Sequence, residues 1–145
     1  MSVRAQVDAV LTAIYNILSG DAGLASQIKR FYQGMINVIP DYPAIIISIA
    51  GFDSSFRATN IREEEIRVQI FVYVQDFDAG EVTVRKLACD VIDVLRANTS
   101  FNSTVYDNGA SPGYSVDVGV AARGNDTPFA ALIQFVCRAT QPRTS

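Results

Sequence analysis

A strictly alternating segment, Glu65–Gln75 (EIRVQIFVYVQ), constrains the fold of this chain more than any other feature. Successive side chains of a strand point to opposite faces, so apolar residues at every second position share one face. Those residues are Ile66, Val68, Ile70, Val72 and Val74. The segment therefore predicts a long strand with one face buried, which the other elements must cover.

The following segment, Asp78–Ala97, changes to helical spacing. Val84, Ala88, Val91 and Leu95 fall on one stripe, and charged residues lie largely away from it. Asp78 is the expected N-cap, with Glu81 three residues later to cap in return. The sequence thus predicts a long strand, a tight corner and a long helix that folds back on the sheet.

The remaining elements complete one α+β domain over residues 1–145. We expect a helix from Val3 that ends at Gly20 and a short helix within Asp21–Arg30. The expected strands are Phe31–Tyr32, Ala44–Ile49 (buried on both faces), Ser103–Asp107, Tyr114–Val120 (exposed on one face) and Phe129–Arg138, with a loop at Gly51–Asn60. This order predicts a mostly antiparallel sheet with the N-terminal helix and the long central helix packed on one face.

Composition excludes several classes of function. The chain has a net charge of −3, whereas binding to nucleic-acid phosphates needs a concentrated basic surface. It has no histidine, the usual general base and the commonest metal ligand. We expect no cofactor and no catalytic set, and we read Cys89 and Cys137 as buried free thiols.

The N-terminal segment is not expected to be a secretion signal. Arg4 and Asp8 interrupt its apolar residues, which follow helical spacing. No apolar run in the sequence approaches the length of a membrane span. We therefore expect no membrane association.

Two acidic groups carry alternative interpretations. Asp76 and Asp78 could hold a divalent cation, although the favoured interpretation is a helix cap and a solvated carboxylate. Glu63–Glu65 could likewise be a metal or basic-partner patch. The favoured interpretation is a solvated strand entry, or one side of an intersubunit salt bridge with Arg57 or Arg62.

The long strand is too long for its domain. Residues Ile61–Gln75 would span about 50 Å if fully extended, whereas a domain of this size has a radius of gyration of roughly 15 Å. Either the strand bends at Glu63–Glu65, or its beginning and the preceding loop project as an arm. Such an arm with apolar residues could reach a neighbouring molecule.

The whole layout resembles the tail terminator (tail completion) family of tailed bacteriophages and related contractile particles. After the N-terminal helix, the matching segments are Asp21–Tyr32 (DAGLASQIKRFY), Tyr42–Ser48 (YPAIIIS), the RVQIFVYV strand, Asp90–Arg96 (DVIDVLR) and a final pair of strands. These are patterns of spacing rather than catalytic motifs, and together they extend over most of the chain.

The resemblance implies a virion protein of the tail and neck region, assembled in the cytoplasm of a bacterial host. Six copies would form a ring on the last tail-tube ring and present a surface to the head-side neck (head-completion) protein. In a contractile particle the ring would also contact the sheath protein. DNA would pass through the lumen without specific binding, which the acidic balance of the chain suits.

The family brings no catalytic residues, so the expected sites are interfaces. We expect Phe52–Glu65 to be a projecting hairpin arm, with Phe56 as its buried anchor, because aromatic residues dominate interface energies. Arg57 and Arg62 would pair with acidic groups on the next subunit. The polar tail Thr140–Ser145 would hold a partner through Gln141 and Arg143. The complete expected interface set is Phe52, Phe56, Arg57, Arg62, Glu63, Glu64 and Glu65.

Two other functions remain open on sequence grounds. One is another component of a phage-like particle, such as a head–tail connector or a tube subunit. The other is a small metal-dependent enzyme that uses Asp76 and Asp78.

Overall fold

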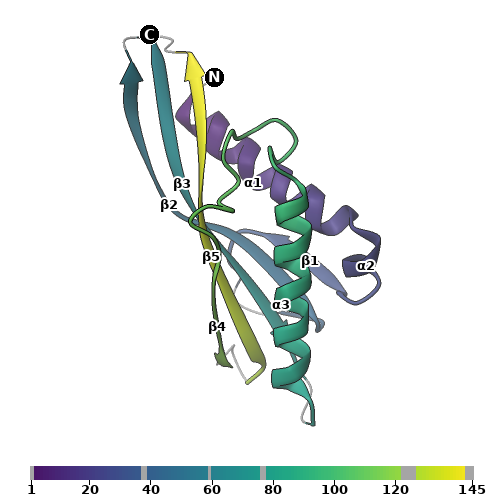
Figure 1. Ribbon diagram of the computed structural model, residues 1–145. Coiled ribbons are helices and arrows are strands. Elements are labelled where there is room, and N and C mark those ends of the chain that lie inside the picture. Colours follow the sequence, from purple (N-terminus) through teal and green to yellow (C-terminus); the bar gives the residue numbers. More distant parts are fainter. Residues whose placement is uncertain (1, 37–38, 59, 76–77, 122–126, 143–145) are drawn as a thin grey trace.

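A computed structural model describes residues 2–36, 39–58, 60–75, 78–121 and 127–142 (Figure 1). Its helices are α1 (Val3–Gly20), α2 (Ala22–Ala25) and α3 (Gly80–Ala97). Its strands are β1 (Arg30–Gln33), β2 (Ala44–Ala58), β3 (Ile61–Val74), β4 (Ser115–Val120) and β5 (Phe129–Pro142). No helix in the described residues is both long and apolar enough to cross a membrane.

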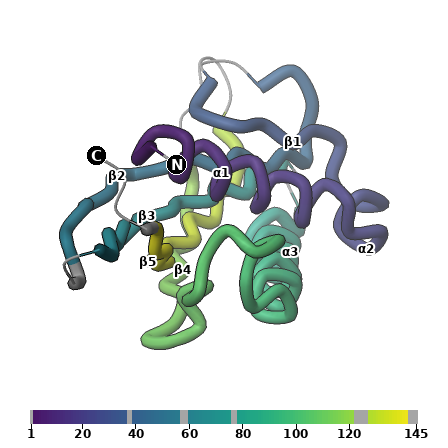
Figure 2. The backbone as a smooth tube through the Cα atoms, turned by 90° about the horizontal axis from the view of Figure 1, so that it is seen from above, coloured from purple at the N-terminus to yellow at the C-terminus, as the bar shows by residue number. Residues whose placement is uncertain are grey.

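The strands form one five-stranded sheet in the order β1-β2-β3-β5-β4. β1 runs parallel to β2, and every other neighbouring pair is antiparallel. α1 and α3 cover the same face of this sheet, and Figure 2 looks nearly along α3 with α1 lying across it. The α+β fold with a mostly antiparallel sheet and two long helices on one face is confirmed.

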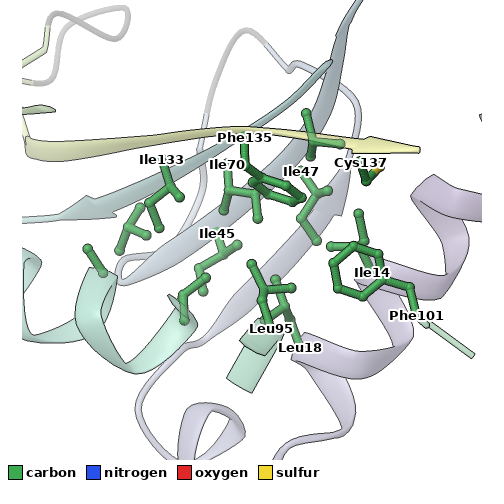
Figure 3. Close-up of a cluster of buried hydrophobic side chains, with 14 of the residues drawn as sticks. Ile14, Leu18, Ile45, Ile47, Ile70, Leu95, Phe101, Ile133, Phe135 and Cys137 are labelled. Atoms are coloured by element: carbon green, nitrogen blue, oxygen red, sulfur yellow. The ribbon is translucent and has the colours of Figure 1, made fainter. Parts of the chain in front are cut away.

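The alternation of β3 produces the main core. Its alternate aliphatic side chains, Ile66 to Val74, are almost completely buried beneath α1 and α3. Neighbouring strands add Ile45, Ile47 and Ile133 to the same layer, which Figure 3 shows meeting the apolar sides of the helices. At about 25 cal/mol per Å² of apolar surface removed from water, this layer dominates the stability of the fold.

A smaller cluster covers part of the opposite face. Ala44, Ile46 and Tyr73 pack there with Ile39, and the ring of Phe71 stacks on Tyr73 at 5.9 Å between centroids. The segment Ala44–Ile47 is therefore buried on both faces, as the sequence predicted. The rest of this face has no helix over it in the described residues, and we call it the helix-free face.

The corner before α3 differs from the prediction. The N-cap is Ala79, with no side-chain capping hydrogen bond, so Asp78 is not the cap. Glu81 forms an ion pair with Arg85 at 3.2 Å instead of capping in return. Gly80, the first residue of the helix, packs closely against β5, since a Cβ there would overlap the ring of Phe129.

The segment after α3 is a tight loop rather than the predicted strand Ser103–Asp107. Phe101, Asn102 and Ser103 have positive φ values of 43°, 56° and 66°, which a strand excludes. Only Asp107 makes a bridge, to Arg138 of β5. We call residues 98–108 the brace loop, because they connect the end of α3 to the far half of β5.

Strand boundaries also differ from the sequence analysis. The predicted loop Gly51–Asn60 is wrong, because β2 continues through most of it and ends at Ala58. β4 is exposed on both faces rather than one, as an edge strand that α3 does not fully cover. The predicted antiparallel pairing of the last two strands is confirmed.

Candidate interaction site

The most distinctive feature of the described chain is a strand extension beyond α3, visible at the upper end of Figure 1. It consists of the β2–β3 hairpin over residues 52–65, which we call the arm. The end of β5 supports it as a third strand, since Thr140 pairs with Glu63 and Pro142 with Ile61. The expected hairpin is thus a pair of strands, with register shifts at Ile49/Gly51 and Phe56/Ala58. Such β-bulges bend a strand and increase its twist.

The β2 edge of the arm has no strand beside it in the described residues. β1 pairs only with Ala44–Ile47, so β2 has an open outer edge from Ser48 onward. The backbone groups at an open edge can pair with another chain. This edge therefore favours association along the arm.

Two phenylalanines project from the arm. Phe52 is 47% exposed and Phe56 is 61% exposed. Their register partners on β3 are Ile66 and Arg62, so both lie on the helix-covered face of the sheet but beyond most of the core. Exposed large aromatic side chains on one face of a strand commonly mark a protein interface.

The arm also contains an ion pair that sequence reasoning placed in solvent. Glu64 is 0% exposed, and the Arg62 side chain, at 12%, forms an ion pair with it. Ser54 donates a hydrogen bond to Oε1 of Glu64 at 3.4 Å, and Oε2 of Glu64 has no hydrogen-bond partner in the described residues. The interpretation of Glu64 as part of a solvated strand entry is wrong, and Arg62 has an acidic partner within its own chain.

The other two glutamates lie on the helix-free face and also have partners in the chain. Tyr106 of the brace loop donates its hydroxyl hydrogen to Glu63 at 3.0 Å. Arg138 lies 3.6 Å from Glu65 and donates to Asp107 at 2.9 Å. The hydrogen bond to Asp107 raises the pKa of Arg138. The brace loop thus fastens this face of the arm to β5.

The expected C-terminal tail is partly a strand. Thr140–Pro142 belong to β5, and Gln141 donates a hydrogen bond to Gln6 of α1. Gln6, in turn, donates to the carbonyl oxygen of Thr104 at 2.6 Å. Gln141 therefore links the arm to α1 and the brace loop, a role that its sequence position did not reveal. Arg143 lies outside the described residues.

Of the remaining candidate residues, the structure describes the surroundings of Asp78 alone. Asp76 lies outside the described residues, as does the side chain of Arg57. Asp78 is exposed, one residue before the cap of α3. In the part of the chain that the structure describes, no group of three or more Cys, Asp or Glu residues is placed to hold a metal ion.

The two cysteines differ in environment, which corrects the expectation that both are buried. Cys89 is exposed and Cys137 is buried, and burial is the main cause that raises the pKa of the Cys137 thiol to about 12. At pH 8 only about one in 10⁴ Cys137 side chains would be a thiolate, the reactive form. Titration with a disulfide reagent should therefore detect one fast thiol per native chain, two in denaturant and none in native Cys89→Ser. Fast reaction of native Cys89→Ser would contradict the buried position of Cys137.

In comparisons with known proteins, no model of a protein family matches this sequence, and no curated protein sequence matches it.

Proposed function

We propose that this chain is a structural subunit that closes with five other copies into a ring of the tail terminator type. The ring ends the tail tube, meets the neck protein on its head side and, in a contractile particle, contacts the sheath. DNA passes through its lumen without specific binding, and the protein resides in the tail and neck region of the virion. It acts by assembly, with no chemical step.

One observation carries this proposal: the arm combines exposed Phe52 and Phe56 with an open strand edge. An arm that is braced on one face by Tyr106 and Arg138 keeps its shape before it meets a partner. A preorganised contact loses less conformational entropy on binding than a flexible loop does. Sixfold symmetry and the position in the particle come from the resemblance in sequence layout.

Phe56→Asp should prevent ring formation while the monomer stays folded. Truncation of an interface anchor commonly weakens each contact by about 30-fold or more, and a buried charge adds to this loss. Light scattering coupled to size exclusion should give a sixfold mass for the natural chain and a monomer mass for the variant. Far-UV circular dichroism should give the same thermal midpoint for the Phe56→Asp variant as for the natural chain kept monomeric.

Val82→Asp is the matched control, because Val82 is 55% exposed on α3 and lies outside the arm. It makes the same change from an apolar side chain to a carboxylate and should leave the rings intact. Rings of unchanged mass from Phe56→Asp, or a natural chain that stays monomeric at high concentration, would refute the proposal. Labelling of the ring in intact particles separates a terminator, at the junction of tube and neck, from a connector or a tube subunit.

A further inference from the structure

Asn108–Gly109 is the one Asn-Gly pair in the sequence. In an unfolded chain such a pair is chemically labile, because glycine has no side chain to hinder attack of its backbone nitrogen on the asparagine carboxamide. The Gly109 nitrogen bonds to Cγ of Asn108, the Cγ–Nδ2 bond breaks, and ammonia leaves with the proton of the Gly109 nitrogen. Water then opens the resulting succinimide ring at either carbonyl, which gives aspartate or isoaspartate at position 108.

The fold requires each residue of this pair at its place. Nδ2 of Asn108 donates to the carbonyl oxygens of Leu95 and Asn98, each at 3.2 Å, and so caps the end of α3. Gly109 has φ 87°, and a Cβ there would lie 2.7 Å from the carbonyl oxygen of Val136. A labile pair is therefore built into the contact between the brace loop and β5.

The contacts of the pair also oppose its reaction. Asn108 is 6% exposed, its Oδ1 accepts from the backbone of Ala110 at 3.1 Å, and the Tyr114 hydroxyl donates to its carbonyl oxygen at 3.1 Å. The backbone N–H of Gly109, which must lose its proton, donates to Oδ1 of Asp107 at 2.9 Å. Ring closure makes Cγ tetrahedral and expels Nδ2, so it must break both hydrogen bonds to α3. The reaction therefore requires the brace loop to open first.

The products are incompatible with the closed loop. Aspartate at position 108 places a carboxylate oxygen where Nδ2 donates, opposite two carbonyl oxygens and at the negative end of the α3 dipole. A buried charge that faces acceptors rather than donors is costly, and isoaspartate also adds a methylene group to the backbone. The brace loop would lose its attachment to α3, and its contacts from Tyr106 to Glu63 and from Asp107 to Arg138 would lose their support.

We propose that Asn108–Gly109 is a latent deamidation site, which the closed brace loop protects and whose conversion permanently detaches the brace loop from α3. The change is permanent because ammonia does not condense back onto a carboxylate in water. Every opening of the loop exposes the pair to the reaction, so the extent of conversion records how often the loop has opened. This chemistry does not depend on the proposed self-association.

Peptide mass spectrometry of the ageing protein measures the reaction directly. The natural chain is incubated at pH 8 in buffer and, in parallel, unfolded in urea, and the modified fraction of residue 108 is followed over time. A loop that is open for about 0.1–10% of the time should slow the reaction about 10- to 1000-fold relative to the unfolded chain. Equal rates in the two samples would overturn the proposal.

Tyr114→Phe tests whether the loop provides the protection. This variant loses one hydrogen bond to Asn108 and keeps its aromatic ring, so the loop should open, and residue 108 should react, about two- to tenfold faster. Tyr32→Phe is the matched control, because it makes the same change in β1, at the other edge of the sheet from β4, and should leave the rate unchanged. The same rate in both variants would contradict protection by the brace loop.

Asn108→Asp reproduces the aspartate product and tests its consequence. Its thermal midpoint by circular dichroism should fall by about 5 °C or more, because the new carboxylate faces two carbonyl oxygens. Asn102→Asp is the matched control, since it makes the same change at an exposed position of the same loop and should keep the natural midpoint. Equal midpoints for the two variants would show that conversion leaves the brace loop attached.

Discussion

Arg62→Ala should lower the free energy of unfolding by about 3–5 kcal/mol, the range observed when one partner of a buried ion pair is removed. The reason is Glu64, a carboxylate with no exposed surface whose ion-pair partner is Arg62. Its Oε2 has no hydrogen-bond partner in the described residues, so the variant would leave a nearly unsolvated charge.

Urea unfolding at a protein concentration too low for ring formation measures this loss without a contribution from assembly. Arg62→Ala/Glu64→Leu is the first control, because replacement of both charges by apolar groups is often neutral or stabilising. Arg67→Ala is the second control: its ion pair with Asp53, at 2.6 Å, is exposed and should contribute no more than about 1 kcal/mol. Equal losses from Arg62→Ala and Arg67→Ala would show that the Arg62–Glu64 pair is not buried in solution.

The alternation that predicted β3 also contained the signal for this ion pair. Arg62 and Glu64 continue the same even-numbered series as Ile66 and Val68, so a strand that stays straight must point them toward the covered face. Three consecutive glutamates nevertheless predict a solvated run, because charged residues are rarely buried. Applied to every residue of the strand, the alternation places Glu64 on the covered face and Glu63 and Glu65 on the opposite face.

The parts of the fold that could not be predicted from the sequence depend on pairing between segments that are distant along the chain. Gly51, Asp53, Ser54 and Ser55 favour a loop locally, yet β3 beside them supplies a ladder of backbone hydrogen bonds. The polar end Thr140–Pro142 is likewise a strand only because Ile61–Glu63 lies next to it. A depression of about 290 Å³ beside Arg67 and Ser115 combines residues of four strands and a loop, so no single segment of sequence could indicate it.

The brace loop is the second place where a single change should have a large effect. Phe101→Ala should cost about 3–5 kcal/mol, as deletion of a buried phenylalanine commonly does. Phe101 is completely buried, and its ring meets Phe135 of β5 edge to face at 6.1 Å between centroids (Figure 3). Its φ of 43° is equally unfavourable for alanine, so the loss would come from the missing side chain rather than from backbone strain.

Ser103→Gly separates backbone from side-chain effects in the same loop. Ser103 is exposed with φ 66°, a conformation that glycine adopts without a steric penalty, so this change should leave the stability unchanged or raise it by up to about 1 kcal/mol. A loss below about 1 kcal/mol for Phe101→Ala would show that the loop does not depend on its buried ring.

The loss in Phe101→Ala should also spread to the arm. Thr104 accepts the hydrogen bond from Gln6, and Asp107 holds Arg138, so a loosened brace loop removes two supports from the far half of β5. Hydrogen exchange of backbone amides in β5 beyond Phe135 should therefore become faster in Phe101→Ala, while exchange in the β1–β2 pair stays slow. Faster exchange in the arm together with weaker ring formation would indicate that the proposed association requires an arm that is held in shape.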